Sequence, residues 1–237
     1  MNNPVIILAK GPSARFLPSS DKYDVATINN ASWMHPSPKW SFHNDLEPME
    51  LMSDDDFKEI KTIICPSYVH TLKNPRFNNI NSDFHFHRLA EFFPGRFDHI
   101  NFQVYELHPG DNSRIEEQKR TGLKSADDVA TLPEWPHTTT QTATMWLLKY
   151  ENIKDIIIAG ADPGKGYHPY FSERARKWES DRGLTKPAFD GNGSAPEAPH
   201  VYGPCWEQSV KWANNYGARL RHINDVSESE LKELGIE

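Results

Sequence analysis

The chain has 237 residues, 37% of them hydrophobic, and a formal net charge of −7. These values predict one domain with a substantial core. The negative net charge disfavours non-specific nucleic-acid binding, which usually requires a basic surface that contacts the phosphates. The only cysteines, Cys65 and Cys205, provide neither a disulfide framework nor a zinc-ligand spacing. The sequence has no signal-peptide pattern and no apolar run of spanning length, so we expect a cytoplasmic protein without a transmembrane segment.

Short apolar runs bounded by turn residues recur along the chain. Because these runs are continuous rather than alternating, they predict strands that are covered on both faces, as in a parallel sheet. The predicted strands are residues 5–9, 24–29, 39–44, 61–66, 154–162 and 218–223, with a less regular one at 101–109. This pattern predicts an α/β fold with a Rossmann-like, mainly parallel sheet and helices on both faces.

Several segments between the strands have helical spacing or recognisable caps. Ser53 and Ser227 are predicted N-caps, and Gly217 follows the end of a predicted helix. The predicted helices are residues 53–60, 138–152, 204–217 and 227–235, with an exposed helix of mixed charge at 172–183. We expect a single domain over residues 1–237, with an irregular, lid-like insertion at about 163–203, where glycine, proline and charge are concentrated.

The first predicted strand continues into Lys10, Gly11, Pro12 and Ser13. In an open parallel sheet, ligands bind beyond the carboxyl ends of the strands. Gly11 permits close approach of a backbone to a ligand, and a helix that begins at Pro12 and Ser13 would direct free N–H groups at an anion. The alternative interpretation is an ordinary strand-to-helix turn.

The order of several motifs resembles the bacterial sialyltransferases of the Campylobacter type. The motifs are Gly-Pro-Ser after the first strand, two strands that end in asparagine, TIICPSYVHTL (62–72), the threonine-rich helix and strand at 138–162, and HVYG (200–203). The same order is similar to a wider set of Gly-Pro-Ser α/β proteins, which includes archaeal-type 6-hydroxymethylpterin diphosphokinases. The chain departs from the pattern at Ala9, where the family has glycine, and at His137, where it has arginine. The resemblance implies a CMP-sugar-like site and leaves the identity of the sugar open.

The resemblance also implies which residues contact the donor nucleotide and its sugar. They are Gly11, Pro12, Ser13, Asn29, Asn30, Asn44, Thr139, Thr140, Gly160 and Asp162. By their chemistry, Lys10, Lys165, Tyr167 and Tyr170 are candidates to hold a departing phosphate through charge or hydroxyl hydrogen bonds. Each of these positions also has an ordinary structural use as a cap, a turn or a solvated side chain.

Sugar transfer to a hydroxyl requires a general base, and histidine suits that role near neutral pH. We expect His200 to be the base, with His168 second and His137 third. We expect no metal site and no required cofactor, since the nucleotide-sugar is itself the donor. We expect the protein to bind a glycan or another hydroxyl compound as the acceptor. A nucleic acid is considered only as such an acceptor, and the sequence leaves the oligomeric state open.

Two alternatives to a glycosyltransferase follow from the same residues. An ATP-dependent diphosphokinase would need Mg²⁺ at the strand tips, for which Asp45 and Asp162 are the candidate ligands. A non-catalytic nucleotide-binding protein would keep the nucleotide site and lack the base.

Overall fold

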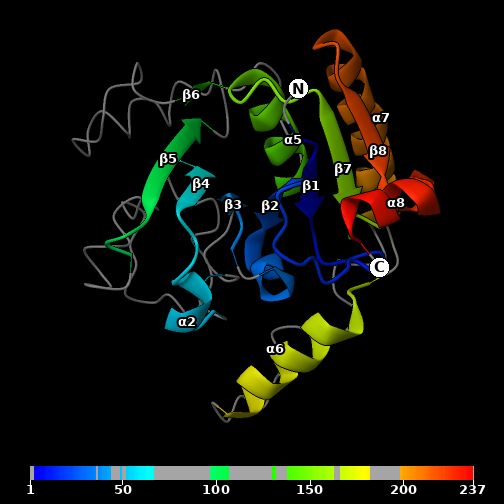
Figure 1. Cartoon of the computed structure of the whole chain (residues 1–237). Helices are drawn as coiled ribbons and strands as arrows, with labels where there is room; N and C mark the ends of the chain where they lie inside the picture. The colour runs from blue at the N-terminus through cyan, green and yellow to red at the C-terminus, as the bar shows by residue number, and fades with distance from the viewer. Residues whose placement is uncertain are drawn as a thin grey trace.

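The computed structural model describes residues 3–35, 37–43, 49, 52–66, 97–106, 130–131, 138–162, 166–181 and 198–236. Within these residues, eight strands form one sheet in the order β6-β5-β4-β3-β2-β1-β7-β8, with every neighbouring pair parallel (Figure 1). The strands are β1 (Val5–Leu8), β2 (Asp24–Ile28), β3 (Trp40–Phe42), β4 (Thr62–Pro66), β5 (Asn101–Glu106), β6 (Ala130–Thr131), β7 (Asp155–Ala159) and β8 (Arg219–His222). The predicted α/β fold with a parallel sheet is confirmed.

Strand β1 is the point at which the strand order reverses direction. Strands β2 to β6 follow one another on one side of β1, whereas β7 and β8 lie on the other side. In a doubly wound sheet this reversal places a switch point between β1 and β7. The carboxyl ends of β1 and β7 point toward the part of the molecule where α6 lies (Figure 1).

Helices and 3-10 turns cover both faces of the sheet. They are η1 (Asn29–Met34), α2 (Asp54–Phe57), α5 (Thr139–Lys149), α6 (Pro169–Asp181), α7 (Ala198–Asn215), η5 (Ile223–Asp225) and α8 (Glu228–Leu234). Because successive strand side chains point to opposite faces, Val5 and Ile7 pack with α5 and α7, whereas Ile6 and Leu8 belong to the core under η1, α2 and α8. Two buried faces explain why the strands are continuously apolar.

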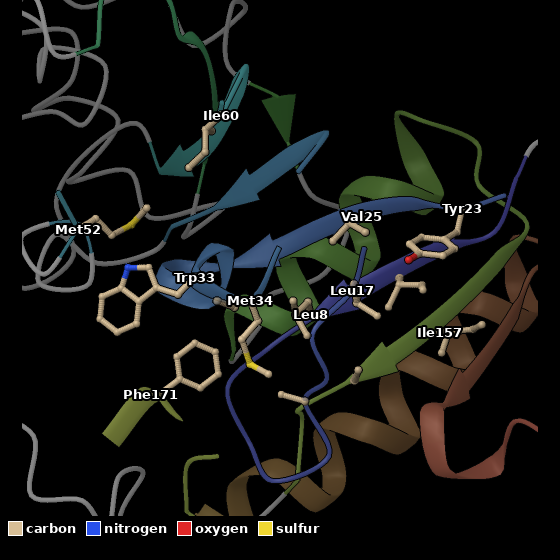
Figure 2. Close-up of a cluster of buried hydrophobic side chains, with 14 of the residues drawn as sticks. Leu8, Leu17, Tyr23, Val25, Trp33, Met34, Met52, Ile60, Ile157 and Phe171 are labelled. Atoms are coloured by element: carbon tan, nitrogen blue, oxygen red, sulfur yellow. The ribbon is translucent and has the colours of Figure 1, made fainter. Parts of the chain in front are cut away.

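The start of α6 is anchored on the η1 face. Phe171 is buried and stacks near Trp33, with ring centroids 6.1 Å apart, at the end of the core where Figure 2 also shows Met34 and Met52. The Arg174 guanidinium lies 4.3 Å from the centroid of the Trp33 ring. Its Nη2 also donates to Asp56 Oδ1 at 2.6 Å, which joins α6 to α2.

The predicted helices at 138–152 and 227–235 are confirmed as α5 and α8, and that at 53–60 as the shorter α2. Ser53 forms a capping box with Asp56, which confirms that the acidic residues at 54–56 begin a helix. Helix α7 begins earlier than predicted, at Ala198. Within the described residues, no helix has the length and apolarity needed to cross a bilayer.

The predicted helix after Gly-Pro-Ser is wrong. The Ala14 N–H donates to Gly11 O in a single turn, and residues 14–20 then run without regular structure. Pro18 lacks a backbone donor and disfavours helical geometry at Leu17, so a helix starting at Pro12 would end almost at once. The Leu17 N–H instead donates to Met34 O at 3.1 Å.

The insertion predicted at 163–203 is mostly helical in its described part. Helix α6 occupies 169–181, in agreement with the predicted mixed-charge helix, and α7 begins at residue 198. Residues 163–165 and 182–197 lie outside the described residues.

Candidate functional site

Polar residues follow five strands at the carboxyl edge of the sheet. Because all the strands are parallel, their carboxyl ends lie on the same edge. Most of the sequence-predicted site residues within the described part of the chain therefore share this edge. They separate into two groups, which differ in whether their polar atoms have hydrogen-bond partners.

The first group, which we call the clasp, consists of Ser13, Asp162 and His222. The Ser13 N–H and hydroxyl both donate to Asp162 Oδ2, each at 2.7 Å. The Ser13 oxygen also accepts the Gly160 N–H at 2.8 Å. The N–H and hydroxyl of Ser13, which we expected to be free for a ligand anion, are thus occupied by a carboxylate of the protein itself.

His222 completes the clasp from the end of β8. Its Nε2 lies 3.4 Å from Asp162 Oδ1 and 3.3 Å from Ser13 Oγ. Its Nδ1 accepts the Asn224 N–H at 3.3 Å, so Nε2 carries the proton in the neutral ring. Serine, histidine and aspartate are the residue types of a nucleophilic triad, but the Ser13 proton goes to Asp162 and not to the histidine, so Ser13 is not activated.

The carboxylate of Asp162 is held in its ionised form. Only 5% of its side chain is exposed. Burial by itself would raise its pKa, but the hydrogen bonds from His222 and Ser13, together with the charge of His222, lower the pKa below the ordinary value. The ionised side chain therefore ties together the ends of β1, β7 and β8.

Two glycines allow the ends of β1 and β7 to approach this closely. A Cβ at Gly11 would lie 2.6 Å from Asp162 Oδ2 and 2.7 Å from Gly160 O. Gly160 has φ +80°, and a Cβ there would lie 2.4 Å from Ala9 O. The close backbone approach expected at Gly11 is thus made to the protein's own chain, and the clasp fills the space at the switch point.

The second group, which we call the polar trio, consists of Asn29, Asn30 and His43. Their side chains are buried, with 9%, 3% and 0% of their surface exposed. Within the described residues, Asn29 Oδ1, Asn30 Oδ1 and His43 Nδ1 have no hydrogen-bond partner. Asn29 also has φ +54°, a left-handed conformation that asparagine tolerates better than most residues.

Strand register places members of this group in one row with Lys10. Leu8 pairs with Thr27 and Ile28 pairs with Phe42. Continuing both registers past the strand ends aligns Lys10 with Asn29 and Asn29 with His43. The row spans three adjacent strands, about 10 Å at the usual strand spacing.

His43 is a neutral histidine with one satisfied nitrogen. Thr27 Oγ1 donates to Ser41 Oγ at 3.1 Å, and Ser41 Oγ lies 2.9 Å from His43 Nε2. Burial, followed by the positive charge of Lys10, lowers the pKa of His43 to about 3. The ring is therefore uncharged at neutral pH.

The chain before α6 packs against the tip of β1. The Lys10 ammonium lies 4.7 Å from the centroid of the Tyr167 ring, and the His168 N–H donates to Lys10 O at 2.7 Å. His168 Nδ1 accepts the Tyr170 N–H at 3.3 Å, so this side chain caps α6. The Tyr170 hydroxyl lies 3.5 Å from Trp33 O, to which it donates.

Thr139 and Thr140 lie in the first turn of α5, whose core contacts are on the face of the sheet opposite η1. The Thr140 carbonyl accepts the Thr144 hydroxyl at 2.9 Å, and the cap of α5 is Thr138. Asn44, Asp45, His137 and Lys165 lie outside the described residues, as does the side chain of His200, whose backbone lies in the first turn of α7.

Sequence reasoning missed His43 and His222. Both lie within predicted strands, in KWSFHN (39–44) and ARLRHI (218–223). The signal in the first was the alternation of Ser41 and His43 with aromatic residues in a strand that is buried on both faces.

Comparison of the chain with family models, curated proteins and solved structures gives no match. The resemblance in motif order to the sialyltransferases stays a prediction.

Proposed function

We propose that the chain is a glycosyltransferase that binds a nucleotide-sugar at Lys10 and the polar trio and transfers the sugar to a hydroxyl acceptor. One observation carries the proposal. Within the described residues, three buried polar atoms without partners lie at the ends of two adjacent strands at the carboxyl edge of a parallel sheet, and two of the residues that carry them, Asn29 and His43, lie in a row with Lys10.

The unpaired polar atoms of the trio destabilise the protein when no ligand is bound. A buried polar group without a partner costs about 1–3 kcal/mol, and native proteins leave few of them. Three at one sheet edge represent a cost that a bound ligand can recover. The amide oxygens of Asn29 and Asn30 suit the hydroxyl groups of a ribose or sugar, which donate to them, whereas a ring N–H and an ammonium suit the oxygens of a phosphate.

The hydrogen bonds of the clasp favour the β1–β3 side of the sheet edge as the ligand-binding site. A ligand at the β1/β7 switch point would have to replace Asp162 at both donors of Ser13. The unpaired atoms lie instead beyond β2 and β3, so we propose that the ligand binds there, with its phosphate at Lys10 and His43 and its hydroxyl groups at the oxygens of Asn29 and Asn30. Asp162 then serves to hold the Gly-Pro-Ser turn and not to contact the ribose or base.

Binding of a phosphate at Lys10 requires movement of the chain before α6, which contacts Lys10. Lys10 is in contact with Tyr167, and its carbonyl accepts the His168 N–H. We propose that an incoming phosphate replaces the Tyr167 ring at Lys10, while the aromatic residues near the start of α6 limit entry of water. Exclusion of water favours transfer of the sugar to an acceptor over hydrolysis.

His200 remains the proposed base. The Nδ1 of His168 is used by the Tyr170 N–H, which makes His168 the weaker candidate. Replacing His200 with alanine is expected to leave nucleotide binding intact and to abolish turnover, which donor-consumption assays measure. Unchanged turnover would remove His200 from the mechanism.

A thermal-shift panel tests the binding site itself. A ligand that binds only the folded state raises the melting temperature. Stabilisation by CMP or UDP without metal, reduced in Asn30→Ala, supports a nucleotide-sugar transferase. Stabilisation by ATP with Mg²⁺ alone would replace it with the diphosphokinase, and nucleotide binding without consumption of any sugar donor would replace it with a non-catalytic nucleotide-binding protein.

A further inference from the structure

The hydrogen bonds around His43 determine which ring nitrogen carries its proton. The Thr27 hydroxyl donates to Ser41 Oγ, and both buried hydroxyl protons are used when Ser41 in turn donates to His43 Nε2. Nε2 is then an acceptor and carries no proton. In a neutral ring the proton must therefore be on Nδ1.

With the proton on Nδ1, this nitrogen is a hydrogen-bond donor. The His43 side chain is fully buried, and Nδ1 has no hydrogen-bond partner in the part of the chain that the structure describes. Thr27 and Ser41 are also buried, so the chain of hydroxyls is shielded from exchange with water. The ring therefore offers one N–H in a direction set by the sheet.

The charge beside His43 selects the ligand chemistry. Lys10 lies in the same row, and its positive charge acts together with burial to keep the ring neutral. A neutral N–H donor beside an ammonium suits a group with acceptor oxygens and negative charge. A phosphate has both properties, whereas a ribose hydroxyl or a base has no charge.

We propose that His43 binds a phosphate of the ligand through Nδ1–H, and that Thr27 and Ser41 hold it as a donor that takes no part in proton transfer. This inference rests on the proposed function for the identity of the ligand as a nucleotide. It assigns a phosphate-binding role to a histidine that would otherwise be counted as a candidate base.

Nitrogen NMR of histidine side chains tests the tautomer directly. We expect His43 in the free protein to show protonated Nδ1 and unprotonated Nε2 near neutral pH. Saturating CMP, or inorganic phosphate as a smaller probe, should shift the Nδ1 signal. A protonated Nε2, or an Nδ1 signal that does not move while CMP binds, overturns the proposal.

Two matched substitutions test the role in binding. His43→Asn places an amide near the position of Nδ1, whereas His43→Gln places one near Nε2, where it can bond Ser41 but offers no donor at Nδ1. We expect His43→Gln to weaken CMP binding about tenfold or more and His43→Asn to retain most of it, with cytidine, which lacks the phosphate, affected by neither. Equal losses for CMP and cytidine overturn the assignment to phosphate.

The outcomes also separate this inference from the proposed function. If no nucleotide binds the wild-type protein, the proposed function fails, and the response of His43 to inorganic phosphate decides the present inference alone. A shift of Nδ1 on phosphate addition then supports it, and no shift overturns it. Ser41→Ala provides a further test, because loss of the Nε2 partner should allow the other tautomer while circular dichroism shows that the variant is folded.

Discussion

The clasp and the polar trio lie on the same edge of one sheet, but they differ in whether their polar atoms have hydrogen-bond partners. In the clasp, Asp162 Oδ2 accepts two hydrogen bonds from Ser13, and the Ser13 oxygen accepts a third from Gly160. In the trio, Asn29, Asn30 and His43 each have a buried atom without a partner among the described residues.

This difference separates residues that hold the edge together from residues that are available to a ligand. A saturated polar network stabilises the fold and has little remaining capacity to bind. Unpaired buried atoms lower stability, and a ligand that supplies their partners recovers the cost. Substitutions in the clasp should therefore act mainly on folding, and substitutions in the trio mainly on binding.

The largest effect is expected for Gly160→Ala. The new Cβ would lie 2.4 Å from Ala9 O at φ +80°. Left-handed strain and overpacking together predict a loss of about 3 kcal/mol or more in the free energy of unfolding, measured by urea denaturation. Gly217→Ala is the matched control, because Gly217 has φ +60° but a Cβ added there would meet no atom within 4 Å. It should lose only about 1 kcal/mol, and equal losses would show that the β1/β7 approach is not tight.

The next effect is expected for Asp162→Asn. The amide cannot accept at both oxygen positions, and the charge that strengthens the Ser13 hydrogen bonds is lost. A loss of about 2–3 kcal/mol is expected in the same measurement. Asp24→Asn is the control: its ion pair with Lys39 is 2.8 Å long, but the two side chains are 34% and 54% exposed, so its loss should stay below about 1 kcal/mol. A loss that small at Asp162 would contradict the role assigned to the clasp.

The clasp also predicts how stability depends on pH. The pKa of Asp162 is lower in the folded chain than in the unfolded one. Its stabilisation is therefore present in full above the unfolded value, about 3.9, and is lost as the pH falls through the folded value. Stability measured against pH should show wild type and Asp162→Asn converging in acid, where Asp162 is protonated in the wild type. The contribution of Glu230, whose pKa is also lowered, is present in both proteins and cancels in the comparison. Parallel curves would exclude Asp162 as a source of the pH dependence of stability.

Most of the fold could be predicted because buried parallel strands carry a strong sequence pattern. Continuous apolar runs located β1 and β7, and capping residues located α2 and α8. The two-residue β6 has too few residues for any pattern. The helix expected after Gly-Pro-Ser failed because Pro18 and the contact of Leu17 with Met34 outweigh the local turn signal.

The site was harder to predict because partners far apart in sequence decide the role of each residue. Ser13 and Asp162 were both expected to contact a ligand, but 149 positions separate them and they bond each other. Nothing near Ser13 in sequence indicates that pairing. The position of His43 in a strand was evident from KWSFHN, but its tautomer depends on Thr27 in the neighbouring strand.

The smallest effect on stability is expected for Asn30→Ala, and this result distinguishes the two groups most sharply. Asn30 is only 3% exposed, and none of the described residues is a partner for its Oδ1. Removing the amide gives up side-chain packing but also removes the cost of an unpaired atom, so the net change in unfolding free energy should lie within about 1 kcal/mol.

The effects of substitutions on CMP affinity should be larger in the trio than in the clasp, which is the opposite of their effects on stability. Asn30→Ala should weaken CMP binding about fivefold, measured by calorimetry, since the hydrogen bond that Asn30 Oδ1 would accept from a ribose hydroxyl is lost. Ser13→Ala, its counterpart in the clasp, should cost more stability and leave CMP affinity nearly unchanged under conditions where the variant is folded. If Ser13→Ala abolishes binding while Asn30→Ala retains it, the phosphate lies at the Gly-Pro-Ser turn after all. Asp162 would then be a stand-in for the ligand anion at that turn, and the unpaired atoms of the trio would need a different explanation.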